Sequence, residues 1–198
     1  MDITWLGADS LLLRGRETKV LLSPTGDDPQ LPARAGADLV VGGTVKENVL
    51  RPDSGPQVVA RPGEYELAGI TVRGVPLKGA TAFVVEVDDV TVCSFGDLDA
   101  ELSDEAVEQL GFIDALGVSL EGGSPARALA VSQLIARLQP AVMIPTGYQS
   151  VLDAAPGELA AFAREMGVAQ VVPQAKLTLS GSSGTAEETR VVVLEPRR

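Results

Sequence analysis

The first hundred residues of the chain form a series of short apolar runs separated by turn residues, and this pattern constrains the fold more than any other sequence feature. Short runs rich in Val, Ile, Leu and Thr predict β-strands. Strands are expected over 3–7, 10–15, 19–24, 38–43, 56–61, 69–75, 81–89 and 90–96. Asp88 and Asp89 lie between the last two apolar runs and predict a tight hairpin. Residues 24–36 contain three prolines and no clear periodicity, so this segment is expected to be irregular.

From residue 103 onward, helical and strand patterns alternate. Ser103 is a good N-cap, and Asp104 and Glu105 suit the first turn of a helix that ends at Gly111. The other expected elements are a helix capped by Ser124 with Pro125 at its first position, a helix over about 156–166, and strands over 113–120, 140–148, 168–173, 176–180 and 190–196. Two sheets with helices on their outer faces would accommodate this order in one domain over residues 1–198.

Charge and composition exclude several classes of partner and set an expected location. Sixteen basic against 27 acidic residues give a net charge of −11, which disfavours nucleic acids and anionic membrane surfaces. The single Cys93 cannot form a disulfide within the chain and fits a reducing compartment. Neither a signal peptide nor an apolar run of membrane-spanning length is recognisable. The chain is therefore expected to be a soluble cytoplasmic protein.

The stretch VVGGTVKENV, residues 40–49, has the form of a strand that ends in a functional loop. Two glycines break the apolar run, and a polar segment containing Thr44, Lys46, Glu47 and Asn48 follows. Loops that follow strands often carry functional side chains, because the strand holds them in position. The chain contains no histidine, so a histidine-dependent Ser or Cys nucleophile and a histidine-based zinc site are both excluded.

Several motifs, in order along nearly the whole chain, together resemble the metallo-β-lactamase superfamily. The most similar branch is that of the small bacterial metal-dependent hydrolases related to the ascorbate-phosphate lactonases. The motifs are ITWLGADS (3–10), ADLVVGGTVKEN (37–48), RPGEYELAGI (61–70), FGDLDAELSDEAVEQLG (95–111) and GGSPARALAVSQLIARLQPAVMIPTGY (122–148). Of these, the proline-glycine-glutamate-tyrosine-glutamate turn is the most specific. The resemblance implies an α/β (α+β) fold in the form of a four-layer αββα sandwich.

The metal-binding positions that the resemblance implies hold other residue types in this chain. The family loop reads His-x-His-x-Asp-His and falls without gaps on residues 44–49. The affected positions are Thr44, Lys46, Asn48 and Val49 in this loop, Ala8 in the first turn, and Gly147 before the final tyrosine. Ser23 replaces an aspartate that the family often carries, and the loop that would supply a middle histidine is reduced to PLKGA. Asp97 remains at the position of the family's bridging aspartate.

This replacement predicts that zinc, and with it any cofactor, is absent. Zinc takes imidazole, thiolate and carboxylate ligands, whereas an ammonium offers no lone pair and valine cannot coordinate a metal. Asp97 alone would not hold a catalytic zinc. The chain is therefore expected to be a non-catalytic member of the family, a pseudoenzyme that acts in binding or assembly.

Two catalytic alternatives stay open at the sequence level. In the first, Lys46 and Asp97 act on a small anionic ester or lactone, with Glu47, Asp99 and Glu121 completing a charged pocket. The structural alternative is that Lys46 and Asp97 form an ion pair in the space that the metal ion would occupy in the family. In the second, Asp97, Asp99 and Glu47 bind magnesium or calcium, which prefer oxygen ligands. The expected partners are accordingly an unknown protein or a small anionic ligand, and a homo-oligomer that completes the site at the loops after residues 43, 97 and 147 is a further option.

The remaining candidates favour structural roles. Cys93 lies within a strand pattern and is expected to be a buried, inert thiol. Trp5 is expected in the core, and Tyr65 is expected to pack with its hydroxyl group bonded to backbone. Tyr148 could line a residual pocket, but a core or rim position is favoured. The glycine pair in LEGGSP (120–125) could bind an anion at a helix N-terminus, although a tight strand-to-helix turn is the simpler interpretation.

Overall fold

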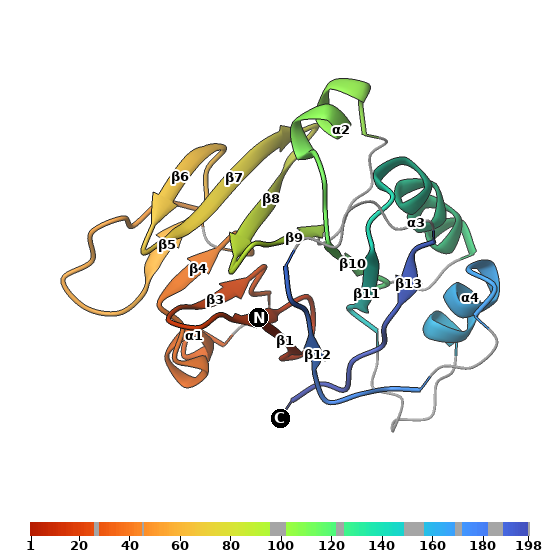
Figure 1. The fold of residues 1–198 in the computed structure, drawn as a ribbon, viewed down its shortest axis with the longest axis horizontal. Coiled ribbons are helices and arrows are strands. Elements are labelled where there is room, and N and C mark those ends of the chain that lie inside the picture. Colours follow the sequence, from red (N-terminus) through yellow and green to blue (C-terminus); the bar gives the residue numbers. More distant parts are fainter. Residues whose placement is uncertain are drawn as a thin grey trace.

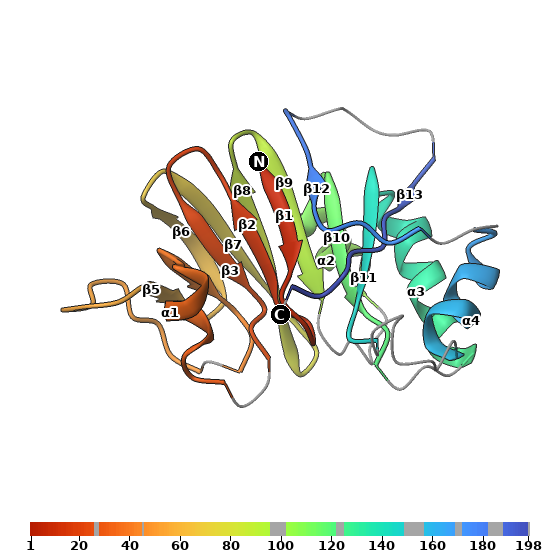
Figure 2. The same ribbon diagram turned by 90° about the horizontal axis from the view of Figure 1, so that it is seen from below.

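Two mixed β-sheets pack face to face in the computed structural model, with helices outside them (Figures 1 and 2). The structure describes residues 1–25, 28–44, 46–95, 102–121, 125–148, 157–168, 172–181 and 188–197. The helices are α1 (Leu31–Ala35), α2 (Asp104–Leu110), α3 (Pro125–Leu138) and α4 (Gly157–Glu165). Helix α1 lies on the side of the first sheet, whereas α2, α3 and α4 lie on the side of the second (Figures 1 and 2). This mixed α+β arrangement confirms the expected fold class.

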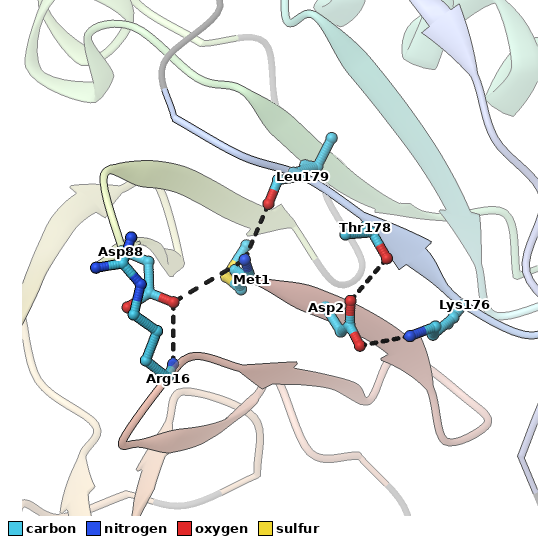
Figure 3. A network of polar contacts seen from close by, with 7 residues as sticks. All are labelled: Met1, Asp2, Arg16, Asp88, Lys176, Thr178 and Leu179. Carbon is cyan, nitrogen blue, oxygen red and sulfur yellow. Dashed lines mark hydrogen bonds and ion pairs between the residues drawn. The ribbon is translucent and has the colours of Figure 1, made fainter.

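The first sheet has six strands in the order β12-β1-β2-β3-β4-β5. They are β1 (Asp2–Trp5), β2 (Leu11–Arg14), β3 (Lys19–Leu22), β4 (Leu39–Val41), β5 (Gln57–Val59) and β12 (Leu177–Thr178). Strands β1, β2 and β3 form the expected antiparallel meander, and β4 and β5 then continue the sheet in parallel. Segments from opposite ends of the chain meet here, because β12 pairs with β1 (Figure 3).

The second sheet has seven strands in the order β13-β11-β10-β9-β8-β7-β6. They are β6 (Gly63–Leu67), β7 (Ile70–Leu77), β8 (Ala80–Val87), β9 (Val90–Phe95), β10 (Ala115–Ser119), β11 (Val142–Thr146) and β13 (Arg190–Val191). Strands β6 to β9 are antiparallel, and β9, β10, β11 and β13 are parallel. Both β10 and β11 are buried along their whole length, as expected for parallel strands covered on both faces.

In each sheet an aspartate immediately precedes one of the parallel strands, Asp38 before β4 and Asp114 before β10. Asp38 N–H donates to Lys19 O and Lys19 N–H donates to Asp38 Oδ2, both at 2.9 Å. In the second sheet, Asp114 N–H donates to Thr91 O at 2.9 Å and Thr91 N–H donates to Asp114 Oδ2 at 2.8 Å. The two aspartates thus fix the start of β4 and of β10 by the same pair of hydrogen bonds.

Several sequence-based expectations are confirmed in detail. Ser103 caps α2 and accepts a hydrogen bond from Ala106 N–H, and the helix ends at Gly111. Asp88 and Asp89 both have positive φ, 51° and 62°, and form the hairpin turn between β8 and β9. Trp5 is in the core with 1% of its surface exposed.

The structure also corrects the expectations at three places. Residues 31–35 form α1 rather than an irregular segment, because a proline lies in its first turn and Gly36 ends it in the left-handed conformation. The GEYEL segment is strand β6, since it pairs along its whole length with β7. Of the strand expected at 168–173, the described residues 168, 172 and 173 lie outside any strand. No helix in the described ranges is long and apolar enough to cross a membrane.

Candidate functional site

The loop after β4, residues 42–49, lies directly against the segment that follows β3. Thr44 N–H donates to Pro24 O at 3.1 Å. A Cβ atom on Gly43 would lie 2.0 Å from the same oxygen, and Gly43 has a φ of 75°. Only glycine fits this approach, which explains the glycine that ends the apolar run.

A series of hydrogen bonds, which begins at the segment after β3, connects this region to the ends of three further strands. Asp9 N–H, in the turn after β1, donates to Thr25 Oγ1 at 3.0 Å. Gly147 N–H, after β11, donates to Ala8 O at 2.9 Å, and Leu120 N–H, after β10, donates to Thr146 O at 2.8 Å. The loops after β1, β3, β4, β10 and β11 therefore meet at one end of the strands. The sequence motifs at residues 8, 44–49 and 147 are thereby brought into one region.

Most side chains of the 42–49 loop face solvent. Thr44, Lys46 and Glu47 are exposed. Val49 is 43% exposed, and its backbone forms an isolated antiparallel bridge with Val58. The family motif would place histidines at residues 44, 46 and 49. In this chain all three side chains are exposed, and the backbone of Val49 also forms a bridge.

Asn48 is the anchor of the loop. Its Oδ1 accepts hydrogen bonds from Ala60 N–H at 2.8 Å and Arg61 N–H at 3.0 Å. Its Nδ2 donates to the hydroxyl oxygen of Tyr65 at 3.0 Å. That hydroxyl in turn lies 3.0 Å from Arg61 O and 3.2 Å from Pro62 O, which confirms the expected backbone contact of Tyr65. Asn48 therefore ties the loop to the start of β6.

Gly147 occupies a space that is closed to side chains. Its φ is 68°, and a Cβ atom there would lie 2.2 Å from Ser119 Oγ and 2.9 Å from Asp9 Oδ1. Real Cβ atoms do not approach other atoms at such distances, so a histidine or any other side chain requires the surroundings to shift. The position before Tyr148 is filled by polar groups of neighbouring strands.

A buried polar cluster, which the sequence analysis missed, occupies this place. Asp9 is 5% exposed, and Ser119 and Thr146 are fully buried. Thr146 Oγ1 donates to Asp9 Oδ1 at 3.1 Å, and Ser119 Oγ accepts from Glu121 N–H at 3.3 Å. The only sequence signal for Asp9 was an acidic residue in the turn directly after an apolar strand. Its partners come from strands more than a hundred residues away, so no local pattern identifies them.

The remaining candidates have diverse positions. Ala8 and Glu121 are exposed, and the Ala8 carbonyl also accepts a hydrogen bond from Trp5 Nε1 at 2.7 Å. The Tyr148 ring packs against Trp5 in a tilted arrangement at a centroid distance of 4.6 Å, and its hydroxyl donates to Leu194 O at 2.7 Å. Tyr148 thus has the favoured core position, and its burial together with the nearby Glu195 carboxylate raises the pKa of its hydroxyl.

Cys93 is fully buried, and that burial raises the pKa of its thiol. The thiolate, which is the reactive form, is therefore disfavoured, as the sequence analysis expected. Asp97, Asp99 and Ser124 and the two glycines of LEGGSP lie outside the described residues. The Lys46–Asp97 pair and the anion site at LEGGSP thus stay predictions. Within the described ranges, no three His, Cys, Asp or Glu side chains gather closely enough to hold a metal ion.

Two mixed sheets packed face to face, with five loops meeting at one end of their strands, define a metallo-β-lactamase fold. The chain belongs to the metallo-β-lactamase superfamily, since a family model described as a β-lactamase superfamily domain matches residues 2–147. No protein of curated function shows a significant match.

Solved structures with the same fold cover almost the whole chain. A Thermotoga maritima protein, provisionally described as a Zn-dependent hydrolase of the metallo-β-lactamase superfamily, has a TM-score of 0.72 and 24% identity, over 98% of this chain and 99% of its own. The isothiocyanate hydrolase from Delia radicum gut bacteria has a TM-score of 0.57 and 14% identity, over 91% and 100% of the two chains. The metallo-β-lactamase fold protein YhfI from Bacillus subtilis has a TM-score of 0.59 and 10% identity, over 98% of this chain and 97% of its own. At these identities the likeness shows the fold alone.

Proposed function

We propose that this chain is a metallo-β-lactamase-fold protein without a zinc site, which acts as a non-catalytic binding or assembly protein. The observation that carries the proposal is the closed space at Gly147. A side chain in the position of the family's final ligand would overlap Ser119 Oγ and approach Asp9 Oδ1.

The residues at the family's metal positions do not fit a zinc ion. Zinc requires imidazole, thiolate or carboxylate ligands at about 2.0–2.3 Å. Thr44 supplies a neutral hydroxyl and Lys46 an ammonium, which repels a cation. The Asn48 oxygen, at the aspartate position, already accepts two backbone hydrogen bonds. The donor set that would lower the pKa of a bound water is therefore missing from these positions.

The names of similar structures do not argue against this proposal. The isothiocyanate hydrolase shares the fold at 14% identity. One fold can carry many unrelated functions, because activity depends on the residues of the site and not on the scaffold. A chain that has kept the scaffold can thus serve in binding through its loops or its surface.

The alternative function is hydrolysis of a small anionic ester or lactone. It is favoured by the exposure of Lys46 and Glu47 on the loop where the family places its metal ligands. In this case Lys46 would stabilise developing negative charge while Asp97 acts as the base, or Asp97, Asp99 and Glu47 would hold a hard cation.

Elemental analysis of the full-length protein, purified without chelators, tests the proposal. We expect less than stoichiometric transition metal and no change in melting temperature when zinc, manganese or magnesium is added. The control is the Glu47→Gln protein, which lacks one carboxylate of the rebuilt cation site. A full equivalent of zinc would overturn the proposal, and a magnesium-dependent rise in Tm that is absent in Glu47→Gln would favour the alternative.

A further inference from the structure

Strand β6 is the outermost strand of the second sheet, and one of its two edges is open (Figure 1). It pairs along its whole length with β7 on the other edge. In the first sheet, the outermost strand β5 is partly covered, because Val49 and Val58 exchange two backbone hydrogen bonds. No described residue covers the open edge of β6 in this way. We call this part of the molecule the β6 edge.

Two residues direct their backbone groups outward at the β6 edge. Ala68 and Gly69, with φ of 51° and 73°, form the two-residue turn between β6 and β7. The residues that flank a turn of this type form a hydrogen-bonded pair, and hydrogen-bonded and non-bonded pairs then alternate along the ladder. Glu64 and Glu66 therefore belong to non-bonded pairs, and their N–H and C=O groups point away from β7.

The side chains of the same two residues carry uncompensated negative charge. Glu64 and Glu66 are both exposed, and they share one face of the sheet because they are two residues apart. Neither forms an ion pair with a described residue. Arg73 lies opposite Glu64 on β7, but its guanidinium donates to Leu110 O at 2.9 Å. The β6 edge thus combines free backbone groups with two unpaired carboxylates.

The other face of β6 is apolar. Tyr65 and Leu67 are half-buried and pack against the core. The 42–49 loop reaches β6 from this side, since Asn48 Nδ2 donates to the Tyr65 hydroxyl oxygen at 3.0 Å. The next two residues, Val49 and Leu50, are 43% and 36% exposed. A strand added to β6 would therefore meet carboxylates on one face and apolar groups on the other.

A second copy of this chain does not suit the β6 edge. In an antiparallel pair of two β6 strands the outward residues lie opposite each other. Glu64 then faces Glu66 of the second copy, or one of the glutamates faces its own counterpart. Like charges in opposed positions destabilise a strand pair, and charged side chains on edge strands prevent self-pairing in many proteins. The charges thus disfavour this chain itself and favour a basic strand.

We propose that the β6 edge binds an extended segment of a partner protein in which two basic residues flank an apolar one. The segment adds a strand to the second sheet by pairing with the backbone of Glu64 and Glu66. Its basic side chains lie opposite the two carboxylates, and its apolar side chain packs beside Tyr65. The proposal names a class of partner for the binding role above, but it does not require the metal positions to be empty.

Fluorescence anisotropy with a labelled, end-capped peptide of sequence Thr-Lys-Val-Lys-Val-Thr tests the proposal. The matched control, Thr-Lys-Lys-Val-Val-Thr, has the same charge and composition but places its two lysines on opposite faces of a strand. We expect saturable binding of the first peptide and at least about fivefold weaker binding of the second. The first peptide with both lysine backbone nitrogens methylated keeps its charge, loses its donors to β6, and should bind at least about tenfold more weakly.

Variants of the full chain locate the binding on β6. The double variant Glu64→Gln and Glu66→Gln should weaken binding of the first peptide at least about fivefold. The double variant Glu17→Gln and Glu108→Gln removes two exposed carboxylates from other elements and should leave Kd unchanged.

A proline on the β6 edge tests the backbone contact separately from the charge. Proline is tolerated on edge strands where the N–H faces solvent. Glu66→Pro should therefore leave the circular dichroism spectrum unchanged and weaken peptide binding more than Glu66→Gln does.

Four results would overturn the proposal. Equal binding of the two isomeric peptides, or full binding of the methylated one, would show attraction by net charge alone. An unchanged Kd in the Glu64→Gln and Glu66→Gln double variant would place the contact elsewhere. A dimer of the unaltered protein that Glu66→Pro dissociates in sedimentation would show that a second copy occupies the edge. Metal content does not enter any of these results, so this test and the test of the proposed function fail independently.

Discussion

At the residue scale, the junction of β1, β10 and β11 depends on the absence of a side chain at Gly147. Gly147 leaves room for the buried Asp9 carboxylate and the Ser119 hydroxyl, and its own N–H holds the Ala8 carbonyl. Thr146 completes the contact by donating to Asp9. Direct hydrogen bonds therefore connect the ends of these strands.

Gly147→Ala should destabilise the protein by about 2–5 kcal/mol. A positive φ costs a side chain about 1–2 kcal/mol, and overlap with Ser119 Oγ adds about 1–3 kcal/mol. Urea unfolding measures the loss. Gly69→Ala is the matched control, because Gly69 has a φ of 73° and no atom within 4 Å of an added Cβ. If both variants lose the same free energy of unfolding, the space at Gly147 is not closed.

At the element scale, a single amide side chain connects the 42–49 loop to the start of β6. Asn48 joins the backbone of Ala60 and Arg61 to the hydroxyl of Tyr65. The proline-glycine-glutamate-tyrosine-glutamate motif is therefore a strand start, and its tyrosine holds the neighbouring loop.

Asn48→Ala should cost about 2–3 kcal/mol of unfolding free energy, because it removes two acceptor contacts and one donor contact in a half-buried place. Tyr65→Phe removes only the hydroxyl and should cost about 1 kcal/mol. Denaturant unfolding of both single variants and the double variant gives their coupling energy, which we expect to exceed about 0.5 kcal/mol. Strict additivity would show that the two side chains act separately.

At the scale of the whole molecule, the N-terminal strand β1 is joined to β12, which comes from the C-terminal part of the chain (Figure 3). The Met1 ammonium donates to Leu179 O at 2.9 Å. The Asp2 carboxylate accepts hydrogen bonds from Lys176 Nζ and Thr178 Oγ1, each at 2.7 Å. Because β12 is only two residues long, these side-chain contacts contribute much of its attachment to the first sheet.

The contact at Asp2 predicts a pH dependence of stability. The hydrogen bond from Lys176, and then that from Thr178, lower the pKa of Asp2 below its usual value. The contact therefore stabilises the fold above the unfolded pKa of about 3.9, and the benefit is lost as pH falls through the lower folded pKa. For this partly exposed pair we expect about 0.5–1 kcal/mol.

Comparison of Asp2→Asn with the unaltered protein measures this contribution. The variant should be less stable at neutral pH, and the difference should disappear in acid below the folded pKa of Asp2. Lys176→Met serves as a second probe and should show the same convergence. A difference that persists unchanged in acid would mean that the ionised carboxylate is not what attaches β12.

The sequence by itself determined the features that have a local signal. Alternating apolar runs identified most strands, Ser103 identified the cap of α2, and the order of the motifs identified the superfamily. Of the candidate site, the sequence pointed to the motifs at residues 8, 44–49 and 147, which the fold brings into one region, and to the residue types at those positions.

Only the tertiary structure decided which contacts the residues of the candidate site make. Asp9 and Ser119, more than a hundred residues apart in the sequence, both lie against Gly147. Asp38 and Asp114 precede strands in the same way, and only packing around the second leaves one oxygen buried without a hydrogen-bond partner among the described residues. The physical reason is that hydrophobic periodicity and caps depend on neighbours in sequence, whereas burial, close approach and an unpaired charge depend on which distant strands meet.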